Sequence, residues 1–177
     1  AAVAELRIKY PNLPIVGIEP ALKPAVNNSK DGKILVMATP MTLKEAKFHK
    51  LLDRYRDKRE IEPVPCGGLM EYVEQGILEG DELDDYLREK LKPFMDSKIS
   101  SIVLGCTHYP FVKNAIEKVV GQDVDIIDGS LGTARELMRR LKEKDLLNDS
   151  KEKGTIEMIN SSNKQELIDL SWKLIEM

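Results

Sequence analysis

The sequence has few cysteines, no long hydrophobic run and no basic excess, and each shortage excludes a class of protein. Cys66 and Cys106 lie far apart, which fits neither a disulfide framework nor paired zinc ligands and favours a reducing, cytoplasmic location. No apolar run approaches the roughly 20 residues that span a bilayer, so we expect no membrane association. Lys and Arg total 27 against 30 Asp and Glu, so the net charge of −3 provides no basic field for nucleic acid.

Sequence signatures of the common cofactors are also missing. We find no pyridoxal phosphate lysine motif, no Gly-rich nucleotide fingerprint and no metal-ligand cluster, so we expect chemistry without a cofactor or metal. There is no short-period repeat, and the polar, charged stretch Asn148–Gly154 is the only plausible linker or flexible loop.

Apolar segments of strand and helix type alternate along the chain, which predicts an α/β fold with a parallel, doubly wound or flavodoxin-like sheet. The run Ile34–Ala38 is apolar throughout, as expected for a strand that is covered on both faces. The expected strands are Ile15–Glu19, Lys33–Thr39, Ile61–Cys66, Ser101–Cys106, Val124–Asp128 and Thr155–Asn160. The expected helices are Ala1–Tyr10, Leu43–Arg59, Leu69–Gly80, Glu82–Ser97, one after Pro110, Thr133–Glu143 and Lys164–Ile175.

Polar and reactive residues close several of these strands. Because ligands of open parallel sheets bind beyond the carboxyl ends of the strands, these residues predict one shared rim, without assigning it a reaction. They are Glu19, Thr39, Cys66, Cys106 and Asp128.

The segment Gly105–Pro110 is the most informative part of the sequence. It places Cys106 between an apolar strand and a helix opened by Pro110, near free backbone N–H groups that favour a thiolate. His108, two residues later, is able to take or supply the thiol proton. The alternative is that Cys106 is a small buried residue at a strand end, as free cysteines usually are.

This Gly-Cys-Thr-His-Tyr-Pro segment resembles the second catalytic-cysteine motif of glutamate racemases. Two further matches are Ile18-Glu19-Pro20 and Thr39-Pro40-Met41-Thr42, each at the end of an apolar strand, and the similarity extends along essentially the whole chain. The related aspartate racemases usually have an acidic residue after Cys-Thr, so His108 favours the glutamate branch.

The resemblance implies roles for the residues of this motif. Cys106 would be one of two thiol acid/base residues, assisted by His108, and Thr107 would contact the substrate. Thr39 and Thr42 match two threonines around the substrate carboxylate. For Thr42 the alternative is a capping box, Thr42-Leu43-Lys44-Glu45, that starts a helix without any ligand.

Two further residues are assigned by the same resemblance. Glu74 would orient the catalytic histidine, with a solvated helix glutamate as the alternative and Glu71 as a competing candidate. The family assigns Cys66 no catalytic role, and the segment Cys66-Gly67-Gly68 departs from the proline-containing segment of many relatives. We therefore interpret Cys66 as structural, with a position on the active-site rim as the alternative.

The family architecture implies two α/β lobes around a cleft. Residues 21–128 would form a complete second lobe that carries Cys106, and residues 1–20 and 129–177 part of the first lobe. The first catalytic cysteine of the family lies in a Cys-Asn-Thr motif, which these 177 residues do not contain. We therefore expect an amino-terminally truncated chain that is inactive alone and prone to self-association, from a protein that is a homo-oligomer.

The implied activity is the cofactor-independent interconversion of L- and D-glutamate, an isomerase reaction. It would supply D-glutamate for peptidoglycan, and hence cell-wall biogenesis and cell shape, in the cytoplasm of a bacterium. One alternative is another racemase of the superfamily, acting on aspartate or a hydantoin, or a related decarboxylase. The other is a non-catalytic α/β binding or regulatory module that keeps the rim without the chemistry.

Overall fold

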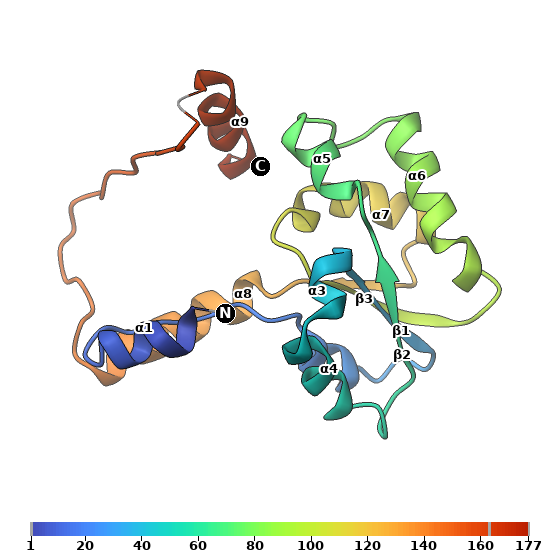
Figure 1. Ribbon diagram of the computed structural model, residues 1–177, viewed down its shortest axis with the longest axis horizontal. Helices are drawn as coiled ribbons and strands as arrows, with labels where there is room; N and C mark the ends of the chain where they lie inside the picture. Colours follow the sequence, from blue (N-terminus) through green and yellow to red (C-terminus); the bar gives the residue numbers. More distant parts are fainter. Residues whose placement is uncertain (1, 163, 177) are drawn as a thin grey trace. The chain divides into compact units, whose positions relative to one another are not determined.

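The computed structural model of the chain describes residues 2–162 and 164–176 (Figure 1). Ala1 of the first expected helix, and Asn163 and Met177 of the expected first lobe, lie outside the described residues. The contacts divide the chain into two compact units, Ala1–Glu19 with Gly129–Thr155 and Pro20–Asp128 with Ile156–Met177. The family resemblance assigned residues 1–20 and 129–177 to one lobe, whereas the contacts group Ile156–Met177 with the other unit. The lobe assignment stays a prediction.

The larger unit contains a parallel sheet, which confirms the expected fold class. Within the described residues the sheet has four strands in the order β2-β1-β3-β4, and each neighbouring pair is parallel. The strands are β1 (Lys33–Ala38), β2 (Ile61–Pro65), β3 (Ile99–Leu104) and β4 (Asp125–Ile127). Each of them lies within two residues of an expected strand.

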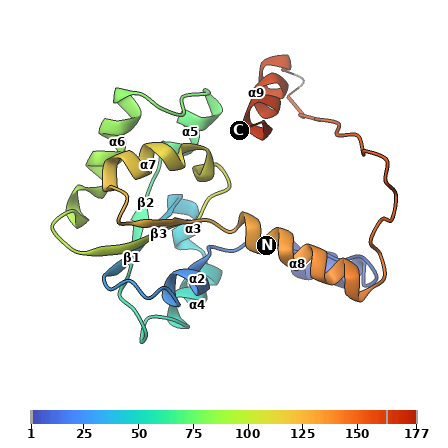
Figure 2. The same ribbon diagram turned by 180° about the vertical axis from the view of Figure 1, so that it is seen from behind.

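Helices cover both faces of this sheet (Figures 1 and 2). Side chains of β1 alternate between two apolar clusters: Leu35 and Met37 face one cluster, and Ile34 and Val36 face the other. The first cluster contains residues of α5 (Leu69–Glu74), α6 (Asp81–Leu91), η2 (Tyr109–Val112) and α7 (Lys113–Val120), and the second those of α2 (Leu22–Val26) and α4 (Ala46–Asp53). Burial on both faces explains why β1 is apolar throughout.

The expected helix Leu43–Arg59 is wrong in its extent. The chain forms α3 (Pro40–Lys44), breaks at the extended residue Glu45, forms α4 and ends the helix at Asp53. The Glu45 carbonyl accepts hydrogen bonds from the first amides of the next turn, so it restarts the helix. Beyond α4, the Arg59 guanidinium donates to the carbonyls of Asn28, Lys30 and Gly32, which holds this loop against the sheet.

The two other expected strands are also wrong. Within the described residues, neither Ile15–Glu19 nor Thr155–Asn160 is assigned to a strand. An extended segment becomes a strand only when a neighbour pairs with its backbone. Ile159 is 83% exposed, so the second segment does not bury its apolar residues here.

The remaining elements are mostly as expected. The smaller unit contains α1 (Val3–Lys9) and α8 (Ser130–Glu143), and Asn148–Gly154 has neither helix nor strand structure. In the larger unit, η1 (Lys92–Phe94) extends α6, and Leu174 of α9 (Gln165–Ile175) packs against the apolar cluster that contains α5. In the part of the chain that is described, no helix is both long and apolar enough to cross a bilayer.

Candidate active site

The expected rim residues follow the carboxyl ends of all four strands of the sheet. The pairs Ala38↔Pro65, Met37↔Leu104 and Val103↔Ile127 lie side by side, so the strands end at one edge. Thr39, Cys66, Cys106 and Asp128 directly or closely follow these ends. Glu19, by contrast, belongs to the smaller unit and closes no strand.

Cys106 lies in a tight turn between β3 and η2. The residue before it, Gly105, donates its N–H to the Met37 carbonyl at 2.8 Å, which brings this turn against the end of β1. A Cβ on Gly105 would lie 3.0 Å from that oxygen and 3.1 Å from Ala38 Cβ, so a side chain would force the two strand ends apart. The Tyr109 N–H closes the turn on the Cys106 carbonyl at 3.3 Å.

The structure brings Cys106, His108 and Glu74 into a line. His108 Nδ1 lies 3.8 Å from Cys106 Sγ, and His108 Nε2 lies 3.5 Å from Glu74 Oε1. Cys106 and His108 are half-buried, while Glu74 is on the exposed face of α5. A carboxylate on one imidazole nitrogen favours a proton there and leaves the other nitrogen as an acceptor for the thiol proton.

Thr39 and Thr42 form a second polar group beside this line. Their hydroxyl oxygens are 3.0 Å apart, and Thr39 Oγ1 accepts the Thr42 N–H at 3.2 Å, which caps α3. The capping-box alternative for Thr42 is therefore wrong, because Thr39 is the cap and Thr42 lies within the helix. Thr39 directly follows β1, the strand adjacent to β3, so both hydroxyls lie at the same edge as Cys106.

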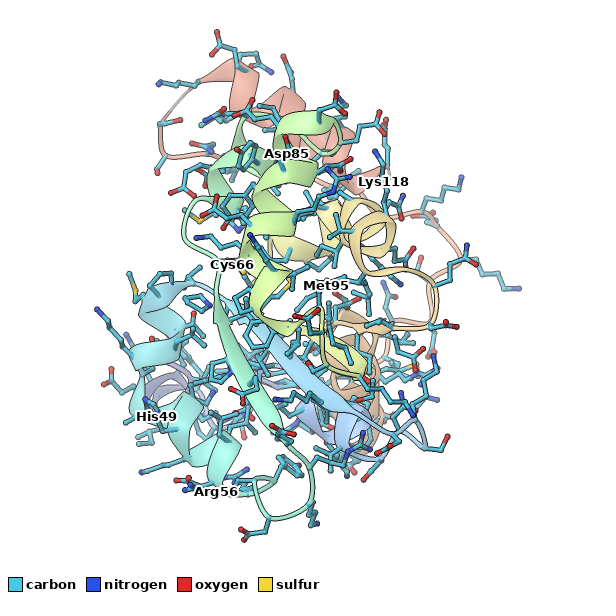
Figure 3. The ribbon with its side chains drawn as sticks, turned by 90° about the vertical axis from the view of Figure 1, so that its right-hand side faces the viewer. His49, Arg56, Cys66, Asp85, Met95 and Lys118 are labelled. Carbon is cyan, nitrogen blue, oxygen red and sulfur yellow. The ribbon has the colours of Figure 1, made fainter. Side chains whose placement is uncertain are left out.

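Thr107 and Cys66 have opposite environments. The Thr107 side chain is exposed in the turn after Cys106, where a ligand has access to it. Cys66, at the end of β2, is 1% exposed and directs its thiol toward the Val64 carbonyl at 3.4 Å (Figure 3). Burial raises the pKa of the Cys66 thiol from 9.0 to about 12. This environment favours the structural interpretation of Cys66 over the rim alternative.

We expect iodoacetamide at pH 8 to alkylate Cys106 and leave Cys66 unmodified in the folded protein. Only a thiolate reacts, and burial both shields Cys66 and holds its proton, whereas Cys106 is half-buried. Because the folded-state pKa is raised, this thiol stabilises the fold below pH 9, and the contribution is lost as the pH rises from 9 toward 12.

Peptide mass spectrometry of the alkylated protein measures both sites, and urea-unfolded protein, in which both cysteines should react, is the control. Labelling of Cys66 as fast as that of Cys106 under folding conditions would show that the Cys66 side chain is accessible.

Two tyrosines contact the turn Cys66-Gly67-Gly68, named here the 66–68 turn, and no sequence pattern indicated this contact. Tyr109, which is fully buried, donates its hydroxyl to the Cys66 carbonyl at 2.9 Å. Tyr86 of α6 donates its hydroxyl to the Gly67 carbonyl at 2.8 Å. Tyr109 is part of the segment that the sequence singled out, but its partner is distant in sequence.

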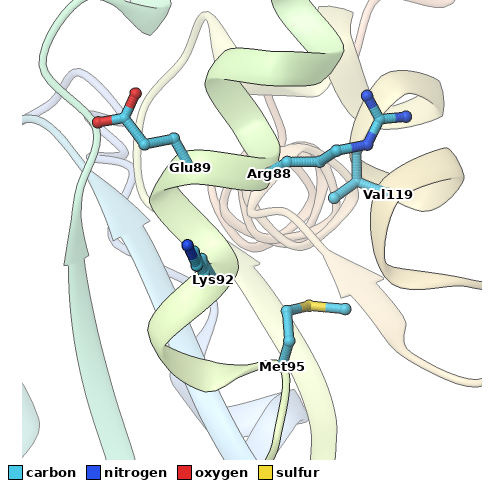
Figure 4. Close-up of a pocket in the computed structure, with 5 residues that line it drawn as sticks. All are labelled: Arg88, Glu89, Lys92, Met95 and Val119. Carbon is cyan, nitrogen blue, oxygen red and sulfur yellow. The ribbon is translucent and has the colours of Figure 1, made fainter.

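A separate pocket of about 520 Å³ lies on the helices of the larger unit (Figure 4). It is lined by Arg88, Glu89, Lys92, Met95 and Val119. These residues lie at the carboxyl ends of α6 and α7 and in η1, close to the points where the chain enters β3 and β4. The pocket is therefore at the amino edge of the sheet, opposite to Cys106.

Comparison with known proteins assigns the family, although no family model matches the chain. The chain is 54% identical over 177 residues to a glutamate racemase of Clostridium perfringens and covers 68% of that protein. It is 52% identical over 176 residues to one of Clostridium botulinum, again covering 68% of that relative. The chain belongs to the glutamate racemase family. This membership disfavours the aspartate, hydantoin and decarboxylase alternatives.

Solved structures of the family have the same fold. Escherichia coli glutamate racemase, in complex with L-glutamate and the activator UDP-MurNAc-ala, superposes with a TM-score of 0.76 at 25% identity, covering 97% of this chain and 65% of that one. The isoform RacE1 of Bacillus anthracis superposes with a TM-score of 0.68 at 31% identity, covering 84% and 57%. The chain thus spans about two thirds or less of the length of these racemases.

Proposed function

We propose that this protein, at its natural length, interconverts L-glutamate and D-glutamate by thiol acid/base chemistry, with Cys106 as one of the two thiols. The observation that carries this proposal is the line Cys106–His108–Glu74 at the sheet edge that also holds Thr39 and Thr42, in a chain of the glutamate racemase family. Racemase activity and D-glutamate as product are supported by the relatives that carry this name.

Inversion at an α-carbon requires acid/base groups on both faces of the substrate. The weakly acidic α-proton leaves one face of the substrate, and a proton must return to the opposite face. One base serves one face only, so two thiols are needed, one as thiolate and one as thiol. Each enantiomer uses the pair in the opposite sense.

This chain supplies one of the two thiols and the residues around it. His108 Nδ1, 3.8 Å from Cys106 Sγ, accepts the thiol proton or returns it, and Glu74 holds the ring from its other side. The hydroxyls of Thr39 and Thr42, together with the exposed Thr107, bind the substrate carboxylate and stabilise the charge that develops as the proton leaves. No cofactor is needed in this scheme.

Cys66 does not supply the second thiol. Its side chain is buried in the apolar cluster that contains α5, and burial raises the pKa of its thiol to about 12. By the family resemblance the second thiol belongs to a Cys-Asn-Thr motif, which these 177 residues do not contain. We therefore propose that the 177-residue chain by itself does not racemise glutamate.

The biological setting follows from the family. D-Glutamate is a building block of peptidoglycan, so the protein would serve cell-wall biogenesis and cell shape in the bacterial cytoplasm. We also propose that it is a homo-oligomer and that the isolated 177-residue chain self-associates, because Leu6, Ile8, Leu131 and Met138 of α1 and α8 are exposed.

Deuterium exchange at the α-carbon tests the reaction. We expect the protein at its natural length to racemise both glutamate enantiomers in heavy water, with deuterium incorporated into the product, and to act far more slowly on aspartate. NMR and chiral chromatography measure the two quantities. A folded protein that carries both thiols but neither racemises nor exchanges glutamate would refute the proposal and favour a non-catalytic binding module.

A further inference from the structure

Three segments meet around Cys106, and two tyrosine hydroxyls bind the backbone of one of them. The segments are the turn Cys106–Tyr109, the 66–68 turn, and helix α5, which begins directly after the 66–68 turn. Tyr109 Oη donates to the Cys66 carbonyl at 2.9 Å and Tyr86 Oη donates to the Gly67 carbonyl at 2.8 Å. Two consecutive carbonyls of one turn are thus held by two side chains from different elements.

The 66–68 turn contains little that would hold it in place by itself. Two of its three residues are glycines, and Gly68 has a φ of 98°, a conformation that side-chain-bearing residues rarely adopt. Inside the turn, the Leu69 N–H reaches the Cys66 carbonyl only at 3.4 Å. The Cys66 N–H donates to the Ala38 carbonyl at 2.9 Å, which fixes the start of the turn to β1. The carbonyls of Cys66 and Gly67 are held from the other side by the two tyrosine hydroxyls.

The His108–Glu74 contact lies beside this hydrogen bond, because α5 begins directly after the 66–68 turn. His108 immediately precedes Tyr109, and Glu74 lies on α5, which packs against η2. Moving α5 away from the 106–109 turn would lengthen the 3.5 Å separation between His108 Nε2 and Glu74 Oε1. The hydrogen bond from Tyr109 to Cys66 therefore joins the segment that carries His108 to the turn from which α5 begins.

We propose that Tyr109 and Tyr86 are positioning residues that clamp the 66–68 turn and thereby hold Glu74 against His108 and His108 against Cys106. This proposal rests on the function proposed above. Burial raises the pKa of both tyrosines well above its usual range, so their hydroxyls remain donors at every pH at which the enzyme would operate. Neither tyrosine touches the reacting atoms, so neither is a catalytic residue.

The test is Tyr109→Phe in the protein at its natural length, since this change removes the hydroxyl and keeps the buried ring. We expect kcat for glutamate racemisation to fall about tenfold, because small misplacements of a catalytic group have effects of at least this order. KM should remain close to that of the unmodified protein. The rate at which iodoacetamide alkylates Cys106 at pH 8 should fall, because His108 is then held less well beside the thiol.

Three further variants complete the experiment. Tyr72→Phe is the matched control, because the Tyr72 hydroxyl contacts Glu82 at 3.2 Å on the exposed side of α5 and α6 and does not reach the 66–68 turn. Glu74→Gln combined with Tyr109→Phe should be no slower than the slower single variant, since both act through His108. Tyr86→Phe provides a second test of the clamp if Tyr109→Phe does not fold.

The outcomes separate this proposal from the proposed function. If Tyr109→Phe matches Tyr72→Phe in kcat and in the alkylation rate of Cys106, the clamp is refuted even though racemisation stands. A lower melting temperature with an unchanged alkylation rate also refutes it, because it shows a purely structural role. If the alkylation rate of Cys106 falls in a protein that does not racemise glutamate, the clamp stands and the proposed function fails.

Discussion

Cys106→Ser in the protein at its natural length is expected to lower the rate of glutamate racemisation by at least about 10³-fold, since general acid/base groups contribute factors of this size. A serine hydroxyl has nearly the volume of the thiol but is a far weaker acid, so it neither forms the base nor returns the proton. His108 remains beside an alcohol that it does not deprotonate. Chiral chromatography of the product measures the loss.

Isotope exchange in heavy water distinguishes the loss of one thiol from a general loss of activity. The remaining thiol still faces one side of the substrate, so the variant should exchange the α-hydrogen of one glutamate enantiomer without inverting it. Cys66→Ala is the matched control, because Cys66 is buried and its side chain has no proposed part in the chemistry. Equal losses in the two cysteine variants, or full racemisation by Cys106→Ser, would disprove the assignment of Cys106.

The largest effect on stability is expected from Leu35→Ala, which should lower the free energy of unfolding by about 3 kcal/mol. Leu35 is fully buried in the central strand β1, between its neighbours Glu62 of β2 and Ile102 of β3. Its side chain belongs to the same apolar cluster as Cys66. Truncation leaves a cavity that a sheet flanked on both sides does not close.

The alkylation rate of the Cys66 thiol measures this change in stability. Because Cys66 reacts only when this cluster opens, its alkylation rate under folding conditions reports the free energy of opening, and Leu35→Ala should accelerate it about 100-fold or more. Met41→Ala is the control, since Met41 is 75% exposed on α3 and its loss should change stability by less than about 0.5 kcal/mol. An unchanged Cys66 rate in Leu35→Ala would show that the two residues do not share one cooperative core.

The central elements were predictable because their apolar patterns are local. The uniform apolarity of β1 indicated a strand with both faces covered, and the structure confirms this. The predictions failed where an element depends on a partner. The segments Ile15–Glu19 and Thr155–Asn160 have strand-like sequences, but strand structure requires a neighbouring backbone, and none pairs with them in the described residues.

The predicted bounds of the helix Leu43–Arg59 were wrong for a different reason. The amphipathic pattern from Leu43 continues through Glu45 without interruption, yet the chain breaks there and restarts as α4, which places Phe48 in the second apolar cluster. Packing against the sheet overrides the local pattern in this region. Beyond α4, the Arg59 guanidinium donates to carbonyls of the loop that precedes β1 and to Ser100 Oγ of β3, and these partners are distant in sequence.

For the site, the sequence by itself determined the residues that are close along the chain. The turn that carries Cys106 and His108 follows from an apolar strand, a glycine and a proline in succession, and the same segment indicated the family. Thr39 and Thr42 were assigned by the family resemblance, and the structure shows that one helical turn separates them, with their hydroxyl oxygens 3.0 Å apart. Their roles in binding and catalysis remain predictions.

Only the tertiary structure decided which distant residues reach that turn. It places Glu74 rather than Glu71 beside His108 and buries the Cys66 side chain in the apolar cluster. It also brings the hydroxyls of Tyr109 and Tyr86 to the 66–68 turn. Patterns along a chain report which face of an element is buried, because that is a local property. Contacts between elements depend on the parallel register of the sheet and on where each helix ends, and both are set by packing of the whole unit.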